Sequence, residues 1–264
     1  MIDPYFIPVI LSAGVGGAGT GLLGVQIVGM RIPFVGVCIS HAAMAGAVFG
    51  QLLGVPPIPA GLLAAVLTSV LLGMVRFEEV HFDINVVMGV LFSLMMGLAF
   101  LGIGLSPGAK TPMLSLMWGS LVLVNYQDVL IIGGGAVLLV GFVVLFFDEL
   151  KAILFSRMLA RAGGIHEQGV WIGFLALAGL VVAVNLQTIG GLMLFSLLIN
   201  PAAAASRLAR GYRQLLMTSA GLGAASALGG FAAAYYMDLP AGACIVLTST
   251  LILAGVVVVE KARK

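Results

Sequence analysis

Long apolar runs dominate the hydrophobic pattern of the chain, and short polar, proline-containing or glycine-containing breaks separate them. An α-helix needs about 20 mostly apolar residues to cross the hydrocarbon core of a bilayer, and the runs have roughly this length. The pattern predicts nine membrane-spanning helices, at residues 5–28, 34–54, 57–75, 84–105, 128–147, 168–186, 188–206, 214–236 and 242–260. The sixth and seventh runs meet at Gln187-Thr188, without a longer polar break between them.

Residues 106–127 interrupt the pattern between the fourth and fifth predicted helices. This stretch begins with Pro107, Lys110 and Pro112 and then becomes more apolar through Trp118. Because proline favours turns over a continuous helix, we predict an outer loop that contains a short interfacial or re-entrant segment.

The composition supports a membrane protein and excludes a soluble one. Of the 264 residues, 61% are hydrophobic and only 8% are charged, whereas a soluble domain carries about 25% charged residues. We therefore predict an all-α polytopic membrane protein, surrounded by lipid, in which residues 1–264 form a single transmembrane domain. The net charge of +2, without a basic cluster rich in aromatic residues, gives no sign of a nucleic-acid partner.

The basic residues fall almost entirely on one side of the predicted bundle. With nine spans the two termini lie on opposite sides, and the side of the C-terminus holds 11 of the 12 Lys and Arg residues. These are Arg31, Arg76, Lys151, Arg157, Arg161, Arg207, Arg210, Arg213, Lys261, Arg263 and Lys264. The positive-inside rule makes this side cytoplasmic, so we expect the N-terminus outside and the C-terminus in the cytoplasm.

Few polar side chains lie within the predicted spans, and those few are candidates for function because polar groups are costly in lipid. His41, which follows Ser40 in the second span, could contact a divalent cation or a gate, or it could hydrogen-bond a neighbouring helix. Asn200-Pro201 is expected to break the seventh helix, and broken helices often line a substrate path, although a plain kink would also fit. Asp238, at a predicted outer helix end, could receive a cation or could be a solvated loop residue.

The longest predicted cytoplasmic segment, residues 148–168, is amphipathic. Apolar residues that include Leu154 and Leu159 alternate at helical spacing with Arg157 and Arg161, and Gly163-Gly164 ends the pattern. Such a helix could lie in the membrane interface or dock a soluble partner. The chain has no Walker A phosphate loop and no soluble catalytic domain, so we do not expect an enzyme, and any ATP hydrolysis would reside in a partner subunit.

Several short motifs, in their order and spacing, resemble the membrane permease subunits of the metal-type ABC importers, which take up zinc, manganese or iron. The motifs are Met30-Arg31-Ile32-Pro33-Phe34-Val35-Gly36, Ser40-His41-Ala42-Ala43, Gly89-Val90-Leu91-Phe92-Ser93, Trp118-Gly119-Ser120-Leu121, Ala160-Arg161-Ala162-Gly163, Ile189-Gly190-Gly191-Leu192-Met193, Leu198-Ile199-Asn200-Pro201-Ala202-Ala203 and Asp238-Leu239-Pro240-Ala241-Gly242-Ala243. The resemblance runs along nearly the whole chain.

The resemblance implies a type II importer fold in the bacterial or archaeal cytoplasmic membrane. Two permease copies would surround one path, two ATPase subunits would dock from the cytoplasm, and an extracytoplasmic metal-binding protein would dock from outside. It also implies that residues 148–164 contain the coupling helix, with Leu154, Arg157, Leu159, Arg161 and Gly163 at the ATPase. The divalent metal would be a transported substrate bound transiently, not a resident cofactor.

One departure from the family concerns the second span. Many members carry an acidic residue a few positions before the Ser-His pair, whereas Val37-Cys38-Ile39 is apolar here. His41 and Asp238 stay as transient metal ligands, and Ser40, Asn200 and Pro201 as residues of the path or gate. The alternatives are an ABC permease for a siderophore or corrinoid, a stand-alone secondary transporter or channel, and a membrane scaffold without transport.

Overall fold

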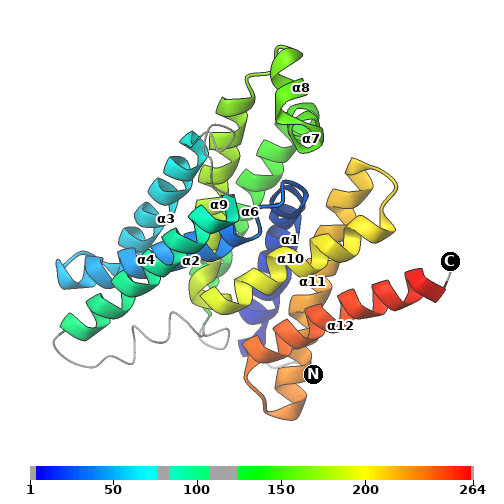
Figure 1. The fold of residues 1–264 in the computed structure, drawn as a ribbon. Helices are drawn as coiled ribbons and strands as arrows, with labels where there is room; N and C mark the ends of the chain where they lie inside the picture. Colours follow the sequence, from blue (N-terminus) through cyan, green and yellow to red (C-terminus); the bar gives the residue numbers. More distant parts are fainter. Residues whose placement is uncertain (1–3, 76–83, 107–123, 263–264) are drawn as a thin grey trace.

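The computed structural model describes residues 4–75, 84–106 and 124–262, and they form a bundle of helices (Figure 1). After a short turn at Pro4–Phe6, the helices are α1 (Ile7–Gly29), α2 (Phe34–Leu52), α3 (Pro57–Met74), α4 (Ile84–Leu105), α6 (Tyr126–Leu145), α7 (Phe147–Phe155), α8 (Arg157–Ala162), α9 (Glu167–Ile189), α10 (Gly191–Leu208), α11 (Tyr212–Met237) and α12 (Ala241–Ala262). Within these residues the predicted all-α fold is confirmed, and no strand is present.

All nine predicted runs form helices. In the described part of the chain, eight helices are long and apolar enough to cross a membrane, namely α1, α2, α3, α4, α6, α9, α11 and α12. The seventh predicted span is α10, whose apolar stretch, Met193–Leu208, is shorter. The chain is therefore a multi-pass membrane protein. Most of the predicted outer segment at 106–127 lies outside the described residues.

Two boundaries show what sets the helix ends. The predicted break at Gln187-Thr188 is wrong, because α9 continues to Ile189 and ends at Gly190, whose φ of 89° is the left-handed conformation that glycine adopts readily. At the start of α6, the side chain of Asn125 accepts hydrogen bonds from the backbone N–H groups of Gln127 (2.8 Å) and Asp128 (3.1 Å). The Asp128 carboxylate accepts in turn from the Asn125 N–H (2.9 Å), which completes a capping box.

Side-chain contacts gather the predicted cytoplasmic ends of several helices at one end of the bundle. Near the end of α1, Gln26 Nε2 donates to the hydroxyl of Tyr212 (2.6 Å) at the start of α11 and to the carbonyl of Leu150 (3.4 Å) in α7. Arg207 of α10 pairs with Glu260 of α12 at 2.7 Å. The basic residues of these ends therefore share one face, as the charge pattern predicts, and we call this face cytoplasmic.

The long helices pack in two groups. The α2 group comprises α2, α3, α4 and α9, and the α1 group comprises α1, α10, α11 and α12. The two groups are joined where α6 packs against both α1 and α9 and where α10 touches α2. In Figure 1, α3 and α4 lie on one side of the bundle, and α11 and α12 lie on the other.

Within the α1 group, glycine allows α1 and α11 to approach backbone to backbone. A Cβ atom added to Gly223 would overlap the carbonyl oxygen of Gly17, and one added to Gly21 would overlap that of Ser219. Ser219 Oγ also donates to the carbonyl of Gly21 at 2.5 Å. Because lipid supplies no hydrophobic drive between helices, this close packing is what holds the pair together.

We expect Gly223→Ala to destabilise the protein by about 1–3 kcal/mol, the usual cost of overpacking a tight interface. The matched control is Gly221→Ala on the same helix, where an added Cβ meets nothing within 4 Å and where alanine favours the helix. The measurement is the melting temperature of each detergent-purified variant. Equal melting temperatures for the two variants would contradict the proposed close packing.

Candidate functional site

His41 lies buried on α2, with only 3% of its surface exposed. Its Nδ1 lies 2.9 Å from the carbonyl oxygen of Val37, one helical turn earlier. Because a carbonyl only accepts hydrogen bonds, Nδ1 carries the proton, and the neutral ring has its lone pair on Nε2. Metal-binding histidines commonly hold their second nitrogen in this way, so the local structure prepares Nε2 to act as a ligand.

The neighbours of His41 hold the ring between α2 and α4. Phe92 of α4 meets the imidazole edge to face, with 4.8 Å between ring centroids and 87° between planes. Ser40 Oγ donates to the Val37 carbonyl at 3.0 Å and lies 3.3 Å from His41 Nδ1. Cys38 Sγ donates to the carbonyl of Met88 at 2.9 Å. The ring is therefore fixed in orientation by groups from two helices.

Asn200 joins α10 to α12. Its Nδ2 donates to Ser249 Oγ (3.0 Å) and to Thr250 Oγ1 (3.1 Å). The prediction that Asn200-Pro201 breaks the helix is wrong, because α10 runs from Gly191 to Leu208 through the proline. Pro201 is buried among neighbouring helices, and the packing around it can hold a helix that lacks one backbone donor.

Asp238 ends α11 at the outer end of the bundle, opposite the cytoplasmic face. It adopts the left-handed conformation, with φ 52° and ψ 45°, and its N–H and that of Leu239 both reach the carbonyl of Ala234. Aspartate tolerates this conformation better than most residues. Its side chain is exposed, so a cation approaching from outside could meet the carboxylate.

The two candidate ligands, His41 and Asp238, and the candidate path residue Asn200 make their contacts in different parts of the bundle. The contacts of His41 are on α2 and α4, those of Asn200 are on α12, and Asp238 is exposed at the end of α11. Among the described residues, no group of three or more His, Cys, Asp and Glu side chains could hold a metal ion.

The predicted coupling segment forms two short helices instead of one. Ser156, with φ −166° and ψ 118°, is extended between α7 and α8, and its Oγ accepts from the N–H of Leu159 at 3.3 Å and so begins α8. Phe155, Met158 and Leu159 are 84%, 73% and 58% exposed. We call these three residues the apolar crest.

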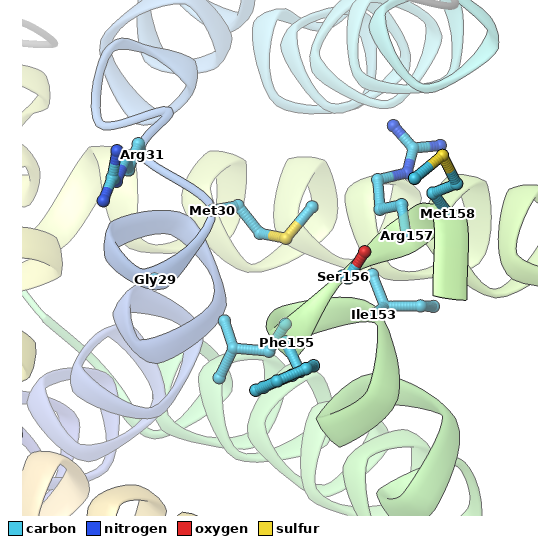
Figure 2. A pocket seen from close by; sticks show the side chains of 9 residues that line it. Gly29, Met30, Arg31, Ile153, Phe155, Ser156, Arg157 and Met158 are labelled. Atoms are coloured by element: carbon cyan, nitrogen blue, oxygen red, sulfur yellow. The ribbon is translucent and has the colours of Figure 1, made fainter. Parts of the chain in front are cut away.

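Cavities lie on both sides of the crest. One, of about 520 Å³, lies between the α1–α2 turn at residues 29–31 and residues 153–158 (Figure 2). The other, of about 630 Å³, lies between α7 and the start of α11 at Tyr212 and Leu215. A protruding apolar crest beside hollows is a surface suited to a protein partner.

The two arginines of the predicted coupling segment both pair with Glu167, a buried residue that the sequence pattern did not mark. Arg157 Nη2 and Nε lie 2.8 and 3.0 Å from Glu167 Oε2. Arg161 donates to Glu167 Oε1 through Nε at 3.1 Å and also through Nη2. Of the other predicted coupling residues, Leu154 packs against Gly29 of α1 and Gly163 ends α8. Leu159 and Arg161 remain exposed on the cytoplasmic face.

Comparison with known proteins gives a consistent result. A sequence model described as the ABC 3 transport family matches residues 3–260. The chain is 29% identical over 244 residues to the high-affinity zinc uptake system membrane protein ZnuB of Haemophilus influenzae, covering 92% of both chains. It is 26% identical over 243 residues to the manganese import system permease protein ScaB of Streptococcus gordonii, covering 92% of this chain and 87% of that one.

Two solved structures share the fold. PsaBC from Streptococcus pneumoniae, in complex with Fab, superposes with a TM-score of 0.85 at 22% identity, over 97% of this chain and 91% of that one. A metal-chelate type ABC transporter in an inward-facing conformation gives a TM-score of 0.79 at 21% identity, over 97% and 89%. At these identities the likeness concerns the fold alone, and it agrees with the predicted importer-like bundle.

The left-handed conformation of Asp238 generates a prediction about stability. Asp238→Gly should keep or raise the melting temperature, because glycine adopts this conformation without strain. Asp238→Val should lower the stability by about 1–2 kcal/mol, because a Cβ-branched residue is strained there. Both variants are melted in detergent, and equal melting temperatures would show that the conformation of residue 238 does not limit stability.

Proposed function

Because the chain belongs to the ABC 3 transport family, we propose that it carries divalent metal ions into the cell as the transmembrane permease subunit of an ATP-binding cassette importer. The cargo is zinc, manganese or iron. Relatives named for zinc uptake and manganese import support this class of substrate. The observation that carries the proposal is His41, a buried imidazole whose Nδ1 is bound to the Val37 carbonyl and whose Nε2 has the lone pair that a metal ion needs.

In the proposed mechanism the ion is bound weakly and passed on. Asp238 at the outer end receives the ion from an extracytoplasmic metal-binding protein, and His41 offers one nitrogen ligand within the bundle. Ser40 helps to orient the imidazole, while Asn200 and Pro201 belong to the opposite side of the path. A site with few ligands lets the ion leave again, because several fixed ligands would trap it.

The energy comes from a separate ATPase subunit, and a second copy of the permease completes the path. The cytoplasmic face supports such a partner, since Phe155, Met158 and Leu159 protrude there beside two cavities. ATP binding and hydrolysis would move this segment and so drive alternating access of the path.

The role of His41 is tested by two substitutions that differ in the position of the polar atom. His41→Asn places an amide N–H near the position of Nδ1, so it can keep the bond to Val37 while removing the Nε2 ligand. His41→Gln places an amide oxygen or nitrogen near the position of Nε2. We expect ATP-driven uptake of Zn²⁺ and Mn²⁺ to fall by about tenfold or more in the asparagine variant and by less in the glutamine variant.

Uptake is measured in liposomes that contain the whole transporter, and expression and melting temperature report on folding. Uptake at the wild-type rate in the asparagine variant would show that Nε2 of His41 does not contact the ion.

The apolar crest generates a separate prediction about the ATPase. Leu159→Asp should weaken co-purification of the ATPase subunit by at least about tenfold, because it puts a charge into a contact that must lose its water. The matched control is Leu53→Asp, which changes a leucine that is 79% exposed at the outer end of α2. The assignment of this surface would be wrong if both variants retained the ATPase equally.

A further inference from the structure

We propose that Glu167 is a positioning residue that fastens α8 to α9, which Gln168 in turn joins to α3. A push on the coupling segment would then act on one helix group through α8 and on the other through α7, and it would move the two groups relative to each other. The inference rests on the proposed function, because it needs an ATPase that pushes from the cytoplasm. It goes further in naming the contact that transmits the push.

The Glu167 carboxylate is fully engaged. Only 2% of its side chain is exposed, and each of its oxygens accepts from one guanidinium group, Oε2 from Arg157 and Oε1 from Arg161. Charged hydrogen bonds that use two N–H groups of one guanidinium fix both angle and distance. The cluster therefore sets the orientation of α8 relative to the first turn of α9.

The α8 helix is short and mostly exposed. The helix has six residues, and only Ala160 is buried. The other contacts of Arg157 also lead to α9, since its guanidinium lies over the ring of Trp171 at 5.5 Å and donates to Gln168 Oε1 at 3.1 Å. These contacts place the start of α8 against the first turns of α9.

The linkage continues from α9 into α3. Gln168 Nε2 donates to the carbonyl of Gly73 near the end of α3 at 2.8 Å. A Cβ atom added to Gly73 would lie 3.2 Å from the Cα of Ile172, so the two helices nearly touch there. A continuous series of contacts thus connects α8 to the α2 group.

Three contacts of α7 connect it to the α1 group. Leu154 packs against Gly29, and the carbonyl of Leu150 accepts from Gln26, both on α1. Phe147 packs against the ring of Tyr212 of α11, with 5.0 Å between centroids. Although α7 also touches α9, the hydrogen bond to its Leu150 carbonyl and the ring contact of Phe147 are with the α1 group.

Ser156 separates these two attachments, and the crest spans it. Phe155 lies just before the extended residue, and Met158 lies just after it. A partner that pushes on both would act on both helix groups, and a joint of one extended residue can absorb a change of angle.

The candidate path residues are divided between the two groups. His41, in contact with Phe92, belongs to the α2 group, whereas Asn200, bonded to Ser249, belongs to the α1 group. Relative motion of the groups would therefore change the space between the helices that carry the candidate path residues.

The first test compares Glu167→Gln with Glu260→Gln in liposomes that contain permease, ATPase and extracytoplasmic binding protein. Glu260 pairs with Arg207 on the same face, but that pair joins α10 to α12 within the α1 group. In Glu167→Gln we expect ATP hydrolysis to stay within about twofold and Zn²⁺ or Mn²⁺ uptake per ATP to fall about tenfold, within the range by which residues along a coupling path change coupling. Glu260→Gln should match the wild type in both.

Two results would overturn the inference. The first is an uptake per ATP in Glu167→Gln that equals the uptake per ATP in Glu260→Gln. The second is a joint fall of hydrolysis and uptake with loss of the bound ATPase, because Glu167 would then be a docking residue only. If the wild-type complex itself hydrolysed ATP without importing either metal, the proposed substrate would be wrong, and the second test would still decide the role of Glu167.

The second test needs no transported metal. Spin labels on cysteines placed at Ala162, Leu71 and Met217, all exposed and all outside the apolar crest, report distances from α8 to α3 and from α8 to α11 with and without ATP. In the wild type we expect the 162–71 distance to stay constant and the 162–217 distance to change. In Glu167→Gln the 162–71 distance should change or broaden. A wild-type 162–71 distance that changes with ATP as much as the 162–217 distance would rule out the fastening role.

Discussion

The cost of placing a charge in the hydrocarbon core of a bilayer governs where this chain puts its few ionisable residues. Most of its basic residues lie at one end of the bundle, where the ends of α1, α7 and α10 and the start of α11 meet. The same constraint leaves the interior to neutral groups, of which His41 and Asn200 are held by hydrogen bonds to neighbouring atoms. The topology, the predicted coupling surface and the candidate path all depend on this separation of a charged cytoplasmic end from a neutral interior.

The charged end presents an exposed apolar surface, and in our proposal it also connects that surface to the two helix groups. The apolar crest is exposed, while Arg157 and the half-exposed Arg161 pair with a carboxylate that is almost fully buried. A buried ion pair stabilises little in net terms but is costly to break on one side, so it suits a contact that must keep its geometry while the helices around it move. In contrast, His41 and Asn200 make hydrogen bonds between neutral groups, which are weaker than those between charged ones.

The hydrophobic pattern predicted all nine long helices, because burial in lipid demands long apolar runs that few other constraints can mask. It placed the end of α9 too early, since it could not show that the left-handed turn falls at Gly190. It wrongly predicted a break in α10 at Pro201, because the contacts that keep this helix continuous come from neighbouring helices. The pattern correctly placed His41 within the second span. Its contacts with the Val37 carbonyl and with Phe92 could be seen only in the structure. Glu167 was missed because one acid beside a span has no periodic signal, although two arginines one turn apart, Arg157 and Arg161, were a sign that an acid should lie close by.

The central claim is that this permease moves a divalent metal ion only when a separate ATPase drives it. The most direct measurement is uptake of radioactive zinc, manganese or iron into liposomes that contain the purified permease, with and without the ATPase subunit and ATP. The account predicts uptake only when permease, ATPase and ATP are all present. Uptake by the permease alone, at the same rate with or without the ATPase, would contradict it and would make the chain a stand-alone transporter or channel.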